Sequence, residues 1–188
     1  MTADRPFLDG RLGPAMIAAA AALLLLLPFT ATFDEFLTSA ALNTGLAAPI
    51  QALAPSVAAQ AAGILWLFGI HAASSGSQLT VWNARGGEVP VFLSWNCLGW
   101  QSAILLGIGM VTGLRREMPL ETRLQVILLG LAGTYLVNLA RIVAVLVIAA
   151  TAGYVPAVVF HDYAGLLMPL LWLFAFWLGV QRWLLPRA

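Results

Sequence analysis

The stretch LQVILLGLAGTYLVNLARIVAVLVIAAT, from Leu124 to Thr151, decides the fold class of this chain. Its 28 residues carry a single charge, Arg141, and about 20 apolar residues suffice for a helix to cross a bilayer. Thr134, Asn138 and Arg141 follow at spacings of four and three residues, so a helix places all three on one face. The stretch therefore predicts a membrane-spanning helix with one polar stripe.

The composition extends this prediction to the whole chain of 188 residues. Hydrophobic residues make up 61% and charged residues 9%, with a mean hydropathy of +0.91, which is typical of an integral membrane protein. We expect residues 1–188 to form a single domain in the cell membrane. There is no lysine and the nine arginines are scattered, so no basic surface is available for nucleic acid.

Four further apolar runs accompany this helix. Gly13 to Thr30 is interpreted as a retained helix and not a cleaved signal peptide. Gly63 to Ala73 is weaker and could span the membrane, re-enter it or lie at its surface. Cys97 to Leu114 and Ala164 to Leu185 are long enough to cross. The sequence predicts an all-α polytopic protein with a bundle of about five to six transmembrane helices.

The orientation of these helices follows from the arginines. In chain order, Cys97 to Leu114, Leu124 to Thr151 and Ala164 to Leu185 are the third, fourth and fifth runs. Five arginines lie between the third and fourth runs or beside the end of the fifth: Arg115, Arg116, Arg123, Arg182 and Arg187. Short loops rich in arginine stay in the cytoplasm, so Cys97 and His161 are expected on the periplasmic or extracellular side. Arg5 and Arg11, before the first run, also favour the cytoplasm. Parity then requires two crossings in residues 31–73 or none, and this choice stays open.

A short external β-hairpin is predicted just before the cysteine. Leu79 to Trp82 and Val89 to Leu93 are rich in β-forming residues and flank the pair Gly86-Gly87. Pro90 makes the second strand an edge strand or a bulged one. This hairpin delivers the chain directly to Cys97.

The segment SWNCLGWQS places the only cysteine, Cys97, among polar residues where an apolar run begins. A lone cysteine cannot form an intrachain disulfide, and the chain has no cluster of ligands for a metal, so we expect no metal and no cofactor. A free cysteine usually behaves as a small hydrophobic residue. At a helix start, with Arg141 within about 4 to 6 Å, it becomes a thiolate and a nucleophile.

Two other polar residues are expected to join Cys97 at the outer rim of the bundle. An arginine inside a span, such as Arg141, normally faces a protein interior, a partner or a cavity. His161 lies just before the fifth run, on the same side as Cys97. A thiol, a guanidinium and an imidazole together supply a nucleophile, an electrostatic stabiliser and a general acid or base.

These features, in this order, resemble the exosortase and archaeosortase family of membrane-embedded, transpeptidase-like enzymes. The resemblance rests on the hairpin before Cys97, on NLARI with Asn138 and Arg141, and on FHDYAG with His161, and it covers roughly residues 60–170. It implies that Cys97, Arg141 and His161 form a catalytic triad. The family usually has a serine or threonine after the cysteine and then a glycine, whereas Cys97-Leu98-Gly99 keeps only the glycine.

The resemblance also implies a substrate and a reaction. The substrate is a secreted protein with a C-terminal sorting tail, made of a short recognition motif, one membrane helix and a basic cluster. Cys97 attacks the carbonyl of the motif to give a thioester, Arg141 stabilises the oxyanion or the thiolate, and His161 protonates the leaving amine. An acceptor, for which a lipid or a glycan is a candidate, then receives the protein.

Three neighbouring residues are predicted to support this site. Asn138 would orient Arg141, and Gln101, one turn past Cys97, would help to bind the substrate carbonyl. Asp162 would orient His161, although adjacent side chains seldom face one another.

Two alternatives remain open from the sequence. In the first, the chain is a non-enzymatic membrane module, such as a transporter or an assembly subunit, and Arg141 lines a polar path or docks a partner helix. In the second, Cys97 is a nucleophile that moves an acyl group onto a lipid or a sugar.

Overall fold

A computed structural model of the chain describes residue 32 and residues 35–83, 86–114 and 118–184. The predicted first span, Gly13 to Thr30, lies outside the described residues. The chain forms two compact units, Met1–Ala41 and Leu42–Ala188. In the first unit the described residues are helical, and every element discussed below belongs to the second. A single membrane domain over residues 1–188 stays a prediction.

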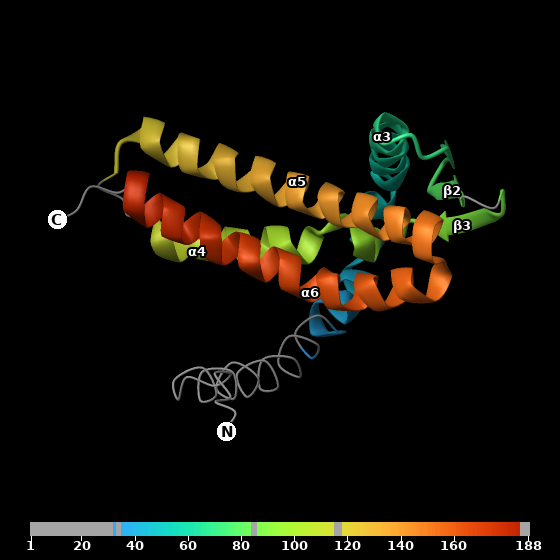
Figure 1. The fold of residues 1–188 in the computed structure, drawn as a ribbon. Helices are drawn as coiled ribbons and strands as arrows, with labels where there is room; N and C mark the ends of the chain where they lie inside the picture. The colour runs from blue at the N-terminus through green and yellow to red at the C-terminus, as the bar shows by residue number, and fades with distance from the viewer. Residues whose placement is uncertain (1–31, 33–34, 84–85, 115–117, 185–188) are drawn as a thin grey trace, which may run out of the picture. The chain divides into compact units, whose positions relative to one another are not determined.

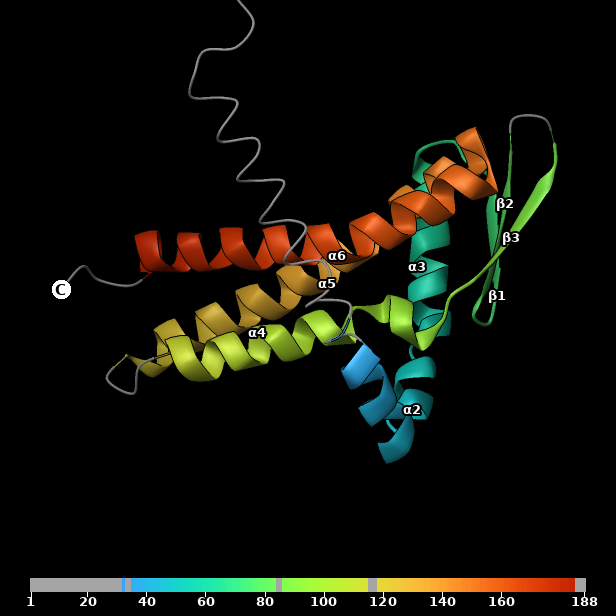
Figure 2. The same cartoon turned by 90° about the horizontal axis from the view of Figure 1, so that it is seen from below.

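Three apolar helices form the main body of the second unit: α4 (Trp100–Gly113), α5 (Leu120–Ala152) and α6 (Tyr154–Gly179). They lie side by side, as Figures 1 and 2 show. Gly153, with a φ of 95°, joins α5 to α6 through an elbow that favours glycine. The last described residues, Val180–Leu184, continue α6 as a π-helix.

Glycines and tryptophans bring these helices close together. A Cβ atom on Gly133 of α5 would overlap the ring of Trp172 on α6. Trp172 Nε1 donates a hydrogen bond to Thr134 Oγ1 at 3.0 Å. Gly109 of α4 lies in the same way against Trp177, whose Nε1 would be 2.8 Å from an added Cβ. Small residues thus create the space into which the large rings pack.

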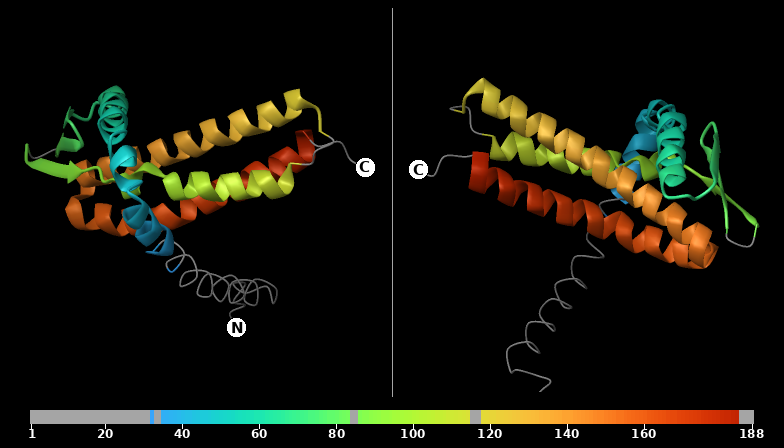
Figure 3. Two further views of the ribbon diagram at one scale, coloured as in Figure 1. Left: turned by 180° about the vertical axis from the view of Figure 1, so that it is seen from behind. Right: turned by 45° about the horizontal axis from the view of Figure 1, so that its top comes forward.

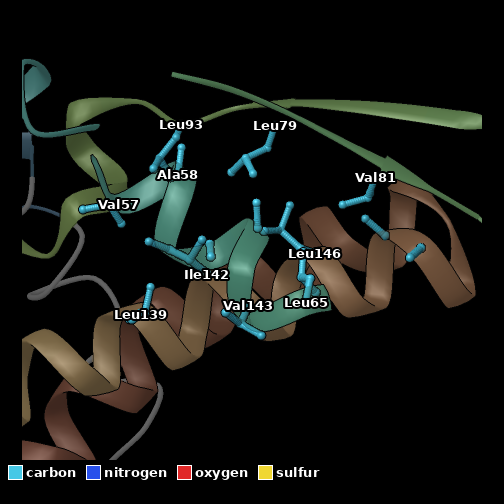
Figure 4. Close-up of a cluster of buried hydrophobic side chains, with 14 of the residues drawn as sticks. Val57, Ala58, Leu65, Leu79, Val81, Leu93, Leu139, Ile142, Val143 and Leu146 are labelled. Carbon is cyan, nitrogen blue, oxygen red and sulfur yellow. The ribbon is translucent and has the colours of Figure 1, made fainter. Parts of the chain in front are cut away.

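Helix α3 (Ala54–Leu67), preceded by the short α2 (Ala47–Gln51), crosses α5 and does not run beside it (Figure 2). A buried cluster fixes this crossing, and Figure 4 shows Leu65 of α3 beside Leu146 of α5. Leu79 of the sheet belongs to the same cluster. Burial of these large aliphatic side chains stabilises the end of α5 where the sheet lies, which Figure 3 shows from behind.

The predicted hairpin is confirmed and is one strand larger than expected. Strands β1 (Ala72–Ser75), β2 (Gln78–Trp82) and β3 (Glu88–Phe92) form an antiparallel sheet in that order. Pro90 lies in β3 opposite Thr80, and β3 is an edge strand, as predicted. The sequence AASS of β1 carries no β-branched or aromatic residue, so nothing in it predicted a strand.

The membrane helices agree in part with the prediction. Among the described residues, three helical segments are long and apolar enough to cross a membrane: Ala47–Leu67, Leu120–Ala152 and Tyr154–Arg182. The mostly helical membrane fold is therefore confirmed. The predicted third run begins too early, because its helix α4 covers only the 14 residues from Trp100 to Gly113. A bundle of five to six spans stays a prediction.

The start of the last helix differs from the prediction by ten residues. It was expected at Ala164, but α6 begins at Tyr154, directly after the elbow at Gly153. Pro156 lies in the first turn, where a missing N–H breaks no helical bond, so it does not prevent the earlier start. His161 consequently lies two turns inside α6 and not in a loop before it.

Candidate active site

Cys97 lies in a short 3-10 turn, Trp95–Leu98, between the sheet and α4. The Cys97 N–H donates to Ser94 O at 2.9 Å, and Ser94 Oγ accepts the Asn96 N–H at 3.4 Å. Gly99 follows with a φ of 74° and separates this turn from α4. The prediction that Cys97 begins the helix is therefore wrong, since a left-handed residue interrupts the helical path. Activation of the thiol comes instead from His161, Arg141 and the main chain at Ser94.

The structure brings His161 to the thiol across 64 residues of sequence. Cys97 Sγ lies 3.5 Å from His161 Nε2, within hydrogen-bond distance for sulfur. His161 Nδ1 lies 3.1 Å from Asp162 Oδ1, so the two adjacent side chains do face one another. Because the carboxylate accepts the Nδ1 hydrogen, Nε2 is left to accept the proton of the thiol.

Arg141 reaches the same turn from α5. Its Nη2 donates a hydrogen bond to the main-chain oxygen of Cys97 at 2.8 Å. A Cβ atom on Gly165, one turn past His161, would lie 3.2 Å from Nη1, so this glycine leaves room for the guanidinium. The guanidinium thus lies between the cysteine turn and α6.

The polar stripe of α5 faces the protein interior, as its residue types suggested. Thr134, Asn138 and Arg141 are 7%, 5% and 6% exposed. Each has a distinct contact: Thr134 accepts from the ring of Trp172, Asn138 lies against Gly99, and Arg141 holds the carbonyl of Cys97.

The thiol of Cys97 is acidified by its surroundings. Burial raises the pKa of the thiol, but the hydrogen bond to His161, the charges of His161 and Arg141 and a main-chain hydrogen bond at Ser94 together lower it by more. The net result is a Cys97 pKa below its ordinary value. A lowered pKa increases the fraction of thiolate, which is the nucleophilic form.

Two of the three supporting residues, Gln101 and Asn138, have other neighbours than expected. Gln101 Nε2 donates to Asn96 Oδ1 at 3.1 Å, so its side chain stabilises the cysteine turn. Asn138 lies so close to Gly99 that an added Cβ there would be 2.8 Å from its Cγ. Asn138 Oδ1 is buried and has no hydrogen-bond partner within the described part of the chain. The contact that the structure shows for the Asn138 side chain is therefore packing against the turn at Gly99.

Gln51 of α2 is a positioning residue that the sequence analysis missed. Its Nε2 donates to Ser77 Oγ at 2.9 Å and to Leu93 O at 3.1 Å, and its Oε1 accepts the Trp95 N–H at 2.6 Å. These bonds fix the linker from β3 to the cysteine turn. The signal available in the sequence was an isolated amide in a long stretch without charges.

A cavity of about 420 Å³ opens between β3, α5 and α6, and Cys97, Arg141 and His161 line it. This volume falls in the usual range of ligand pockets. The other lining residues are almost all apolar: Leu79, Pro90, Val91, Phe92, Leu93, Ile142, Val145, Leu146, Ala149, Tyr154, Ala157 and Val158. In the residues that the structure describes, no group of three histidine, cysteine or carboxylate side chains could hold a metal ion.

The fold and the cavity thus define a helical membrane protein with a thiol–imidazole pair and a buried arginine in one pocket. The profile of the transmembrane exosortases matches residues 8–178, so the chain belongs to the transmembrane exosortase family. This family comprises membrane-embedded sorting transpeptidases that act on secreted proteins with C-terminal sorting signals. Comparisons with curated proteins and with solved structures gave no match.

Proposed function

We propose that this chain is a cysteine peptidase and transpeptidase that cleaves the C-terminal sorting signal of secreted proteins on the outer face of the membrane. The thiol of Cys97 forms a thioester with the substrate, which is then transferred to an acceptor. The 3.5 Å contact between Cys97 Sγ and His161 Nε2, in a cavity shared with Arg141, carries this proposal.

The first half of the reaction forms the thioester. His161 Nε2 takes the proton from Cys97 Sγ, and the thiolate attacks the carbonyl carbon of the scissile peptide bond. As the C–N bond breaks, the imidazolium returns its proton to the leaving amine. The membrane helix of the tail leaves with this amine, and the secreted protein stays bound to Cys97.

The second half transfers the protein. His161 Nε2 accepts the proton of the acceptor nucleophile, which attacks the thioester carbonyl and releases the Cys97 thiolate. The imidazolium of His161 then returns its proton to the Cys97 thiolate, which restores the thiol–imidazole pair. Asp162 keeps the Nδ1 hydrogen in place through both halves, so Nε2 remains the atom that exchanges protons.

Arg141 acts on the nucleophile in two ways. Its positive charge favours the thiolate, and its bond to Cys97 O holds the turn that presents the sulfur. The positive charge of Arg141 also lies in the cavity where the substrate carbonyl would be attacked. It is therefore placed to stabilise the oxyanion, the other role expected for this residue.

The helix lengths support a site at the outer surface of the bilayer. Leu120, where α5 begins, and Arg141 are about 31 Å apart along the helix, and His161 and Arg182 are about as far apart along α6 and the π-helix that continues it. This is the thickness of the hydrocarbon core, about 30 Å. With the arginine-rich ends in the cytoplasm, Arg141 and His161 both reach the opposite surface.

Mass spectrometry of the full-length protein, purified from its native membrane, tests the proposal. We expect an adduct on Cys97 that neutral hydroxylamine releases and that consists of a secreted protein ending just before its membrane helix. Cys97→Ala is the control and should carry no adduct and leave the substrate uncleaved. A fatty acyl adduct would support acyl transfer to a lipid or a sugar, and normal processing by Cys97→Ala would support a non-enzymatic module.

A further inference from the structure

Strand β3 has a free edge. Within the described part of the chain, β3 pairs with β2 alone. Leu93 N–H donates to Ser77 O at 2.8 Å, and Asn83 N–H donates to Gly87 O at 2.9 Å. These two bonds mark the ends of the hydrogen-bonded ladder between β2 and β3. Alternate residues of an antiparallel strand direct their main-chain groups to opposite sides.

The register shows which main-chain groups point outward. Residues 77 and 93 form one hydrogen-bonded pair, and residues 83 and 87 form another. In the register between them, the main-chain N–H and C=O groups of residues 89 and 91 also point toward β2. Glu88, Pro90 and Phe92 therefore direct their main-chain groups to the free edge. Pro90 has no N–H, but at an outward position this costs no bond to β2. The edge offers the N–H groups of Glu88 and Phe92 and three carbonyl oxygens.

This edge borders the candidate active site. Pro90 to Leu93 line the same cavity as Cys97, and the chain reaches Cys97 five residues after Phe92. The remaining wall comes from Leu79 of β2, α5 and the first turns of α6 and is mainly apolar. An extended peptide beside β3 therefore meets hydrogen-bonding groups on one side and apolar surface on the other.

We infer that the substrate segment just before the cleavage point binds as an added strand on the free edge of β3. Its main chain bonds to Glu88 and Phe92, its apolar side chains enter the cavity, and its scissile carbonyl lies at Cys97. The inference rests on the proposed function and names the form in which its substrate is recognised.

The direction of the bound segment follows from the substrate tail. The tail helix must enter the bilayer beside α4, α5 and α6, whereas the sheet lies where α5 ends and α6 begins, away from the start of α5 and the end of α6 (Figure 1). The segment that precedes the cut therefore runs from the hairpin turn toward Cys97. This is the direction of β3 itself, so the added strand is parallel to β3.

Proline substitutions at the edge test this inference, because proline removes the outward N–H and leaves the bonds to β2 in place. The probe is a secreted reporter protein fused to a C-terminal sorting tail. This tail is the one that the protein captured on Cys97 carries before it is cleaved. We expect Phe92→Pro to process it with a kcat/KM roughly 3- to 10-fold below that of Phe92→Ala, the effect of one hydrogen bond. Glu88→Pro should differ from Glu88→Ala by a similar factor.

The reaction of Cys97 with iodoacetamide shows whether each variant keeps an intact site. If Phe92→Pro loses this reaction, Glu88→Pro decides, since proline is well tolerated at the first residue of a strand. Equal processing by the proline and alanine variants would overturn the inference and leave the proposed function intact. A reporter that the unaltered enzyme does not cleave would overturn both.

A photo-crosslinker gives a test that does not disturb the strand. Benzoylphenylalanine in place of Phe92, which is 62% exposed, is introduced into full-length Cys97→Ala together with the same reporter. We expect crosslinks to the residues just before the cleavage point. Crosslinks confined to the tail helix, or none, would contradict binding along β3.

Discussion

Gly99→Ala should destabilise the cysteine turn for two separable reasons. Gly99 has a φ of 74°, and a Cβ in this left-handed region costs about 1–2 kcal/mol. The added Cβ would also lie 2.8 Å from Asn138 Cγ, and forcing extra atoms into a packed interior costs about 1–3 kcal/mol. We therefore expect the free energy of unfolding to fall by about 2–5 kcal/mol.

A double-mutant cycle separates the two contributions. Asn138→Ala removes Cγ and Oδ1, so Gly99→Ala should cost about 1–3 kcal/mol less in that background, while the cost of the φ angle remains. Gly107→Ala in α4 is a matched control, because nothing lies within 4 Å of an added Cβ there and the helix gains stability.

The assay is denaturant unfolding of the full-length protein in detergent, with the rate of Cys97 alkylation measured on the same samples. We expect alkylation to slow in Gly99→Ala and to recover in part in the double variant. Additive costs within about 0.5 kcal/mol would refute the contact between Gly99 and Asn138. A neutral Gly99→Ala would refute the left-handed turn itself.

Three further predictions concern the site. Alkylation of Cys97 should reach half its maximal rate at a pH below the ordinary pKa of a thiol, and His161→Gln, which removes the largest lowering influence, should move this midpoint to higher pH; an unmoved midpoint would contradict the contact. Gly165→Ala should keep or raise thermal stability, because alanine favours a helix by about 1 kcal/mol, yet slow reporter processing by displacing Arg141 by a few tenths of an ångström; normal processing would argue against that contact. Gln51→Glu replaces two N–H donors by acceptors and should cost about 1–3 kcal/mol in stability, measured by thermal unfolding, with slower alkylation of Cys97; an unchanged melting temperature would show that the linker is held otherwise.

Features that depend on periodicity or on the cost of burial were predictable from the sequence. The spacing of Thr134, Asn138 and Arg141 fixed one helical face, and the cost of an exposed guanidinium in lipid required that face to point inward. The turn at Gly86 and the β-forming residues around it indicated two paired strands, which the structure contains.

Features that depend on tertiary contacts were not predictable in this way. Strand β1 pairs with β2 through main-chain bonds, which its alanines and serines do not announce. The close contact between Gly99 and Asn138, which lies 39 residues further along the chain, arises only when α5 packs against the cysteine turn. Gln51 gains its importance only when α2 approaches the linker after β3, and no local pattern encodes that approach.

The His161 ring and the Asp162 carboxylate determine where the active site exchanges protons with its surroundings. His161 and Asp162 have side chains that are 41% and 68% exposed, whereas Arg141 is buried. At the outer-surface position proposed above for His161, the protons that shuttle through Nε2 equilibrate with the water of the outer compartment at the ring itself. No relay through the lipid-embedded helices is needed, so turnover should respond to the acidity of the outer compartment and not to the electrochemical gradient across the bilayer.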